Sequence, residues 1–201
     1  MQAKRRIGLL GGSFNPAHAG HRHISLEALK RLQLDEIWWL VSPQNPLKAH
    51  TDMAGYSTRL AKATLVARHP RIRVLDIEAK QALRFTTDTI DYLQRIYVGT
   101  RFIWLMGADN LSSFHRWRAW QSIAARIPIA VLDRAPYGLK ALHRTFALRY
   151  RQQRLPERNA ASLADVVAPA WTYLTIPRHP LSATELRNSL GTNAFLSHTY
   201  P

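Results

Sequence analysis

The chain has 201 residues, of which 46% are hydrophobic and 20% charged, so it can bury a core of its own and is too hydrophobic to be disordered. Its 28 lysines and arginines against 13 acidic residues give a net charge of +15, which favours anionic partners such as nucleotide phosphates or nucleic acid. The absence of cysteine excludes disulfides, a Cys-ligated zinc site and a thiol nucleophile, and no apolar run is long enough to cross a membrane. These features favour a cytoplasmic protein.

Segments with the hydrophobic pattern of strands alternate with segments that have helical spacing. In chain order the pattern predicts a strand at 7–10, a helix at 21–34, a strand at 35–41, a helix at 56–67, a strand at 72–77, a helix at 88–97, a strand at 102–106, a helix at 111–125, a strand at 127–132, a helix at 141–151, a strand at 171–176 and a helix at 183–190. This repeated order is typical of the α/β class, and we expect a Rossmann-like doubly wound parallel sheet with helices on both faces.

We expect residues 1–201 to form a single domain. The polar stretch 152–161 is the best linker candidate, but too little chain follows it to make a second domain. The segment 134–158, which runs from Arg134 to Arg158, carries seven lysines and arginines against one acid, Glu157. A solvated helical face explains this excess of charge better than a dedicated nucleic-acid interface does.

The first predicted strand runs into an unusual string, Gly11-Gly12-Ser13-Phe14-Asn15-Pro16-Ala17-His18-Ala19-Gly20-His21. In a parallel α/β sheet the ligand binds beyond the carboxyl ends of the strands. Two glycines let the backbone approach an anion, and the following helix start offers free N–H groups and the positive end of a dipole. His18 and His21 are three residues apart, so both imidazoles can face one phosphate. The string is neither a Walker A loop nor a dinucleotide motif, and it holds no acid that would complete a metal site.

This string resembles the signature of the nucleotidyltransferase superfamily, G-G-[ST]-F-[DN]-P-x-H-x-G-H. Further motifs follow in the order that is found in bacterial nicotinate-nucleotide adenylyltransferases, so the resemblance runs over nearly the whole chain. They lie at 43–48, at 85–89, at 106–109 with the Trp-rich 114–120 behind it, and at 181–187. Two positions depart from the family pattern: Asn15 stands where Asp is commoner, and Phe85 stands in place of Tyr.

The resemblance implies roles for particular residues. Catalytic contacts to the reacting phosphates would be made by His18, His21, Lys48 and Arg187. ATP would be bound by Gly11, Gly12, Ser13, Phe14, His21, Gly107, Asp109, Ser182, Thr184 and Arg187. The mononucleotide would be bound by Ser13, Asn15, Lys48, Thr86 and Trp117. The implied cofactor is Mg²⁺, which would arrive as Mg-ATP without a dedicated protein cage, so no residue is assigned as a metal ligand.

Several of these residues also have purely structural interpretations. Ser182 with Glu185 three residues on forms a capping box, and a capped helix start is also a phosphate site that Arg187 could join. Asp109 could be an ordinary N-cap for the helix that follows it. Trp117 could be a core residue, although the resemblance makes it a stacking platform for the pyridine ring, whereas Trp120 is assigned to the core.

The reaction that the resemblance implies is transfer of the adenylyl group of ATP to nicotinate mononucleotide, giving nicotinate adenine dinucleotide and pyrophosphate by direct in-line attack without a covalent intermediate. Nicotinamide mononucleotide or pantetheine phosphate is an alternative acceptor, although enzymes of the pantetheine class are shorter and lack the Trp-rich segment. From a different class, a basic α/β protein with 19 aromatic residues could bind nucleic acid, which would explain the charge but not the ordered motifs. The oligomeric state stays open.

Overall fold

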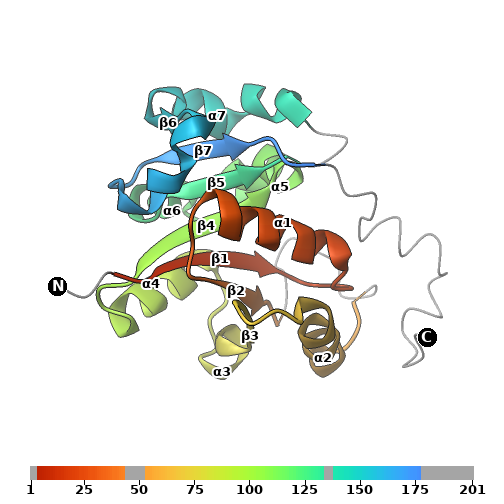
Figure 1. Ribbon diagram of the computed structural model, residues 1–201. Helices are drawn as coiled ribbons and strands as arrows, with labels where there is room; N and C mark the ends of the chain where they lie inside the picture. Colours follow the sequence, from red (N-terminus) through yellow and green to blue (C-terminus); the bar gives the residue numbers. More distant parts are fainter. Residues whose placement is uncertain (1–3, 44–52, 134–137, 178–201) are drawn as a thin grey trace.

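The computed structural model describes residues 4–43, 53–133 and 138–177. Within these residues seven strands form one sheet in the order β3-β2-β1-β4-β5-β7-β6, and every neighbouring pair is parallel (Figure 1). The strands are β1 (Arg6–Gly12), β2 (Glu36–Val41), β3 (Ile72–Leu75), β4 (Arg101–Gly107), β5 (Ile129–Leu132), β6 (Arg154–Leu155) and β7 (Trp171–Leu174). The predicted α/β fold with a parallel sheet is therefore confirmed.

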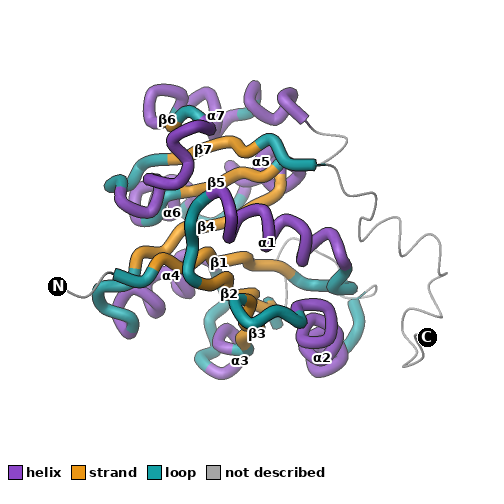
Figure 2. Tube along the Cα trace, viewed as in Figure 1, coloured by secondary structure: helices purple, strands orange, loops and turns teal. Residues whose placement is uncertain are grey.

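Helices connect most of the strands (Figure 2). The α-helices are α1 (Ala19–Arg31), α2 (Tyr56–Ala67), α3 (Ile77–Lys80), α4 (Thr86–Ile96), α5 (Ala108–Ser113), α6 (Trp120–Arg126) and α7 (Thr145–Arg149). Short 3₁₀ helices are η2 (Phe114–Arg116), η3 (Gly138–His143), η4 (Arg151–Gln153) and η5 (Glu157–Asp165). No helix in the described part of the chain is both long and apolar enough to span a membrane.

The strands are buried on both faces because successive side chains point to opposite sides of the sheet. Two neighbouring tryptophans of β2 show this clearly. Trp39 belongs to the hydrophobic cluster that α1, α2 and η5 cover, whereas Trp38 belongs to the cluster that α4, α5, α6 and α7 cover. In Figure 1, α1 lies in front of the sheet and α4, α5 and α6 lie behind it. Helices on both faces were predicted, and the two clusters confirm them.

The strand order reverses between β1 and β4. From β1 the chain proceeds outward through β2 and β3, and from β4 it proceeds in the other direction through β5. Loops that leave the carboxyl ends of two such strands diverge to opposite faces and open a crevice, where ligands of this fold class bind. The β1–α1 loop and the start of α5 both lie at this point.

The structure corrects several predicted boundaries. The helix predicted at 111–125 is broken into α5, η2 and α6, because the Trp117 backbone is extended and Ala119 has a left-handed φ of 50°. The helix predicted at 141–151 is divided among η3, α7 and η4, and the strand predicted at 72–77 ends at Leu75. The stretch 152–161, the best linker candidate, is not a linker: it contains the end of η4, β6 and the start of η5, and η5 buries Ala160 and Leu163 against the sheet. The helix predicted at 183–190 lies outside the described residues.

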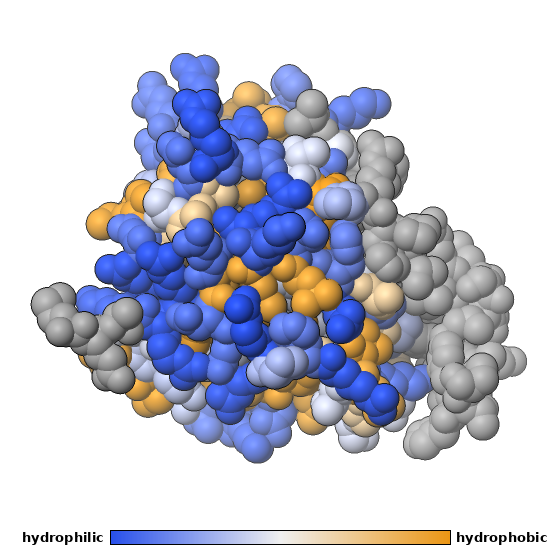
Figure 3. All heavy atoms as spheres, viewed as in Figure 1, coloured by the Kyte–Doolittle hydropathy of each residue, from blue (hydrophilic) through white to orange (hydrophobic). Residues whose placement is uncertain are grey.

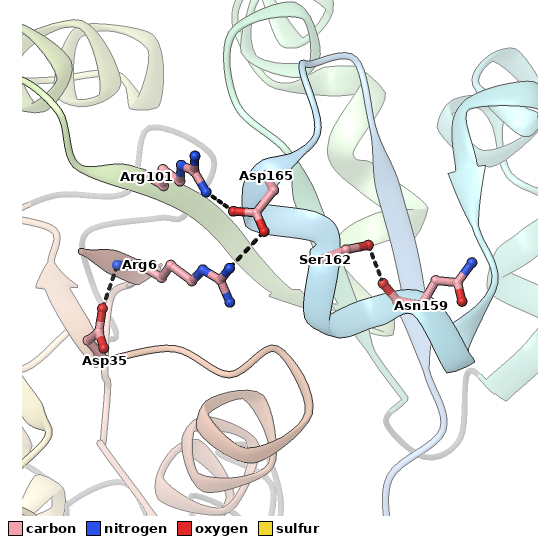
Figure 4. A network of polar contacts seen from close by, with 6 residues as sticks. All are labelled: Arg6, Asp35, Arg101, Asn159, Ser162 and Asp165. Carbon is pink, nitrogen blue, oxygen red and sulfur yellow. Dashed lines mark hydrogen bonds and ion pairs between the residues drawn. The ribbon is translucent and has the colours of Figure 1, made fainter. Parts of the chain in front are cut away.

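The amino-terminal edge of the sheet, opposite the crevice, is held by an ion-pair network (Figure 4). Asp165 of η5 pairs with Arg6 of β1 at 2.7 Å and with Arg101 of β4, and the Arg6 backbone N–H donates to Asp35 at 2.7 Å. Ser162 donates to the carbonyl of Asn159 within η5 at 2.8 Å. Asp165 thus ties the two central strands together at the edge far from the crevice.

The basic segment 134–158 is not one helical face, since its described part spans η3, α7, η4, β6 and the start of η5. The guanidinium of Arg149 lies 5.9 Å from the Trp120 ring, and that of Arg154 lies 5.4 Å from the Trp171 ring. Glu157, the single acid of the segment, pairs with Arg31 of α1 at 3.0 Å. Part of the segment's charge is therefore used in packing, although the face seen in Figure 3 is mostly hydrophilic.

Candidate active site

The two glycines of the motif end β1 at the crevice. An ideal Cβ built on Gly11 would lie 2.6 Å from Cη2 of Trp104, which comes from the neighbouring strand β4. A contact that short is not tolerated, so the Trp104 indole itself requires glycine at this position. The sequence prediction attributed the glycines to the close approach of an anion, and the structure adds this packing reason for Gly11.

The next residues anchor the β1–α1 loop in the fold. Phe14 has a left-handed φ of 46°, and its buried ring stacks on Trp39 with centroids 4.9 Å apart. Asn15 is also buried, and its Oδ1 accepts a hydrogen bond from the Ala54 N–H at 3.1 Å. An aspartate, which is commoner at this place in the signature, would offer an acceptor of the same kind. Because the Phe14 ring belongs to the core, only the backbone of this residue could make the contact with ATP that the sequence predicts.

His18 and His21 form a capping box at the start of α1. The Gly20 N–H donates to Nδ1 of His18 at 3.1 Å, and the His18 N–H donates to Nδ1 of His21 at 3.2 Å. The two ring centroids are 3.9 Å apart. A neutral imidazole whose Nδ1 accepts a hydrogen bond carries its proton on Nε2, so the capping box assigns the same tautomer to both rings. In their neutral forms both histidines therefore carry their proton on Nε2.

Arg59 of α2 is a functional candidate that the sequence analysis missed. Its side chain is 2% exposed and donates four hydrogen bonds to backbone carbonyls, to Ala54 at 3.0 Å, Ser13 at 2.6 Å, Ser42 at 2.8 Å and Pro43 at 2.7 Å. Burial lowers the pKa of Arg59 below its ordinary value. Each bond from a charged donor contributes about 1.5–3 kcal/mol, which offsets this desolvation.

A signal for Arg59 was present in the sequence. The residue occupies the apolar stripe of α2, three positions after Tyr56 and four before Ala63, where an arginine is unexpected. A charged side chain at such a position must find buried partners. The pattern alone could not name these partners, because three of the four carbonyls lie at least 16 residues away in sequence.

The other side of the crevice is formed by the end of β4 and the segment that follows it. Gly107 is the last residue of β4 and the N-cap of α5, so the alternative interpretation of Asp109 as the N-cap is wrong. Asp109 lies in the first turn of α5, where a carboxylate interacts favourably with the helix dipole. Trp117 follows η2 and is half-buried, with its ring edge-on to Trp104 at 6.1 Å and to Phe114 at 5.3 Å. Trp120 packs in the same cluster, as expected of a core residue.

The start of α4 is linked to this segment through an arginine. Phe85 is the N-cap of α4, and Thr86 is its first residue. The guanidinium of Arg118 lies 4.3 Å from the centroid of the Phe85 ring, a distance suited to a cation–π interaction. Arg118 directly follows Trp117, so this contact brings Thr86 and Trp117 to neighbouring places. The predicted set did not include Arg118, and the Phe85 departure gave no hint of this contact.

Four of the predicted residues, Lys48, Ser182, Thr184 and Arg187, lie outside the described residues. Among the described ones, the structure brings His18 and His21 together with the end of β1, which carries Gly11 and Gly12, and with the loop that carries Ser13, Phe14 and Asn15. Trp104 connects this loop to Trp117, because its ring contacts both. Within the described ranges no group of three or more His, Cys, Asp or Glu residues could hold a metal ion.

A parallel sheet whose order reverses at β1 and β4, with a glycine-rich loop and a histidine-capped helix at that point, defines a nucleotide-binding α/β protein. A family model described as cytidylyltransferase-like matches residues 9–189, and the chain belongs to this family. It is 54% identical over 186 residues to a probable nicotinate-nucleotide adenylyltransferase of Bradyrhizobium sp. strain BTAi1, covering 92% of this chain and 97% of that protein. A protein of the same name from Cereibacter sphaeroides is 51% identical, with 90% and 95% covered.

Solved structures agree with the fold. The Plasmodium falciparum nicotinic acid mononucleotide adenylyltransferase complexed with NaAD superposes with a TM-score of 0.71, at 16% sequence identity, over 92% of this chain and 84% of that one. A putative nicotinate-nucleotide adenylyltransferase from Vibrio parahaemolyticus gives a TM-score of 0.54 at 20% identity, over 64% of this chain and 74% of that one. At these identities the likeness concerns the arrangement of the sheet and its helices.

Proposed function

We propose that this chain transfers the adenylyl group of ATP to nicotinate mononucleotide, giving nicotinate adenine dinucleotide and pyrophosphate. The observation that carries the proposal is the histidine pair at the start of α1, set beside the carboxyl end of β1 at the reversal of strand order. Identity of 54% with a relative named for this activity, over nearly the full length of both chains, supports the same reaction.

The chemistry needs alignment and charge neutralisation more than it needs a nucleophilic side chain. A phosphate oxygen of the mononucleotide attacks the α-phosphorus of ATP, a new P–O bond forms, and the bond to the β-phosphate oxygen breaks so that pyrophosphate leaves. The Nε2–H groups of His18 and His21 donate to the α-phosphoryl oxygens, whose charge develops in the transition state. The N-terminus of α1 adds its dipole to the same region. Holding two anionic reactants in line supplies the remaining acceleration.

The remaining residues are assigned to the two substrates. ATP binding is assigned to Gly11, Gly12, Ser13, Phe14, Gly107 and Asp109, together with Ser182, Thr184 and Arg187 of the late motif. The mononucleotide is assigned to Ser13, Asn15, Thr86 and Trp117, and Lys48 is assigned to the reacting phosphates of both substrates. Magnesium enters as part of the Mg-ATP substrate, held by phosphates and water, which is the coordination that Mg²⁺ prefers.

The acceptor specificity gives the first prediction. The start of α4 offers backbone N–H groups and the Thr86 hydroxyl, and the guanidinium of Arg118 lies beside Phe85. Such groups donate to both oxygens of a carboxylate, whereas the NH₂ of an amide is itself a donor and cannot pair with a backbone N–H or a guanidinium. We expect kcat/KM for nicotinate mononucleotide to exceed that for nicotinamide mononucleotide at least about tenfold, which needs only ~1.4 kcal/mol.

Pyrophosphate release with ATP and each acceptor in turn measures this preference, and pantetheine phosphate serves as a third acceptor. Equal values for the acid and the amide would contradict the specificity while leaving adenylyl transfer in place. Pyrophosphate release with pantetheine phosphate and with neither mononucleotide would show that pantetheine phosphate is the acceptor. No release with any of the three would refute the proposed function.

The second prediction concerns the pyridine end of the mononucleotide. Trp117→Ala should raise the KM for either mononucleotide about tenfold, because stacking on an aromatic ring contributes about 1–3 kcal/mol. The KM for ATP should change less than about twofold. Trp117→Phe keeps an aromatic face and should recover most of the loss. Steady-state kinetics with each substrate varied in turn give the KM for the mononucleotide and the KM for ATP separately. A parallel rise in both KM values would show that Trp117 supports the core rather than the ligand.

A further inference from the structure

Arg59 joins three parts of the chain that border the crevice. Its guanidinium reaches Ser13 in the β1–α1 loop, Ser42 and Pro43 at the end of β2, and Ala54 just before its own helix. The first of these lies inside the motif that carries the histidine pair. The second leads into the segment that contains Lys48. A single buried side chain therefore fixes the spacing between the β1–α1 loop and the end of β2.

The direction of these bonds matters for the ligand. A trans peptide is planar, so the C=O of one residue and the N–H of the next point in opposite directions. Because the Ser13 carbonyl points to the Arg59 guanidinium at 2.6 Å, the Phe14 N–H points away from it. The left-handed φ of Phe14 is costly for a residue with a side chain and needs such external support. Arg59 thus determines which way the backbone donor of the motif faces.

We propose that Arg59 is a positioning residue for adenylyl transfer: without touching either substrate, it holds the β1–α1 loop against the end of β2, in the geometry that places the loop's phosphate contacts. The inference rests on the proposed function. None of the ion pairs among the described residues involves Arg59, so carbonyl dipoles rather than a carboxylate stabilise its charge. Carbonyl groups carry no net charge, so the positive charge of Arg59 is not cancelled by them next to the β1–α1 loop.

The same loops are also joined by bonds that do not use Arg59. The Ser42 N–H donates to the Gly12 carbonyl at 2.9 Å, and the Ala54 N–H donates to Asn15 at 3.1 Å. These bonds keep the loops attached when Arg59 is replaced by a similar side chain, so a conservative variant is expected to fold. The variant is expected to lose only the exact position of the β1–α1 loop relative to the end of β2.

The test compares Arg59→Lys and Arg59→Met with the wild type in the pyrophosphate assay. Lysine keeps the charge but lacks the planar fork that serves several carbonyls at once, and methionine keeps only the approximate volume. We expect kcat to fall about tenfold for Arg59→Lys and about 100-fold for Arg59→Met, because small misplacements of reacting groups have effects of this size. Both KM values should change less than about threefold.

A matched control is Arg71→Lys, since Arg71 also donates to a backbone carbonyl, that of Leu34 at 3.1 Å, but at the opposite edge of the sheet. Its kcat should stay within about twofold of the wild type. Thr172→Val in β7 removes a buried hydrogen bond to Leu155 and controls for lost stability alone. All variants are assayed at a temperature where circular dichroism shows them folded. If Arg59→Met does not fold, the kcat of Arg59→Lys alone tests the proposal.

A folded Arg59→Lys with a kcat within twofold of the wild type would overturn the positioning role while the proposed function stands. An increase in KM at unchanged kcat would do the same, because it would indicate ground-state binding instead. A loss of kcat no greater than that of an equally destabilised Thr172→Val would reduce Arg59 to a structural residue. A wild type without turnover would overturn both proposals.

Discussion

Replacing His18 by asparagine is expected to lower kcat at least about 100-fold while leaving the start of α1 intact. Removal of one preorganised donor to a developing negative charge has effects of about 10²–10³ in kcat. Asparagine is among the best N-cap residues, so its side-chain oxygen can replace Nδ1 as the acceptor for the Gly20 N–H. It is too short to replace the Nε2–H donor. The variant therefore separates the structural role of His18 from its catalytic role.

His21→Ala should lower kcat to a similar degree. It also removes the acceptor for the His18 N–H, so we expect it to destabilise the protein by about 1 kcal/mol. His69→Asn is the matched control, because His69 also accepts a backbone N–H through Nδ1, at 3.2 Å from Arg71, in the turn before β3. Turnover and thermal unfolding are measured for all three. If His18→Asn and His21→Ala both turn over like the His69 control, the histidine pair is only a helix cap.

The stability of the protein should depend on pH through Glu78. This carboxyl of α3 is buried and accepts a hydrogen bond from the Thr89 hydroxyl of α4 at 2.9 Å. Burial raises the pKa of Glu78 from 4.5 to about 7, and the bond from Thr89 opposes this rise. The folded state thus holds a proton that the unfolded state has released between these two pKa values. The contribution of Glu78 to stability is present below pH 4.5 and is lost as the pH rises through about 7.

Glu78→Gln keeps an acceptor for Thr89 and carries no charge, so it should remove this dependence. The free energy of unfolding of the variant, relative to the wild type, should increase by about 3 kcal/mol between pH 4.5 and pH 8. Denaturant unfolding at several pH values gives the difference, and a carboxyl titration by NMR gives the pKa directly. Thr89→Val should raise that pKa further. A difference between Glu78→Gln and wild type that does not change with pH would show that Glu78 titrates in its ordinary range.

The sequence determined the features that depend on local pattern. Alternation of strand and helix periods led to a parallel sheet covered on both faces, and all six predicted strands overlap observed ones, namely β1, β2, β3, β4, β5 and β7, with small shifts of their ends. Strand periodicity is a local property, so it is readable without knowing the partners. The string from Gly11 to His21 also identified the histidine pair, because a fixed spacing at a helix start places two side chains on one side whatever lies around them.

Tertiary structure alone decided the features that depend on partners far away in sequence. The sequence shows Arg59 as an unexpected charged residue in an apolar stripe. Its role depends on the carbonyls of Ser13, Ser42 and Pro43, which only the folded sheet brings close to it. Gly11 is required by Trp104, which lies 93 positions later and is its neighbour only through strand pairing. The break at Ala119 and the packing of 152–161 follow the same rule, since contacts with the core override weak local propensity. Local periodicity specifies the elements, whereas the environment of each buried group is specified only when the elements meet.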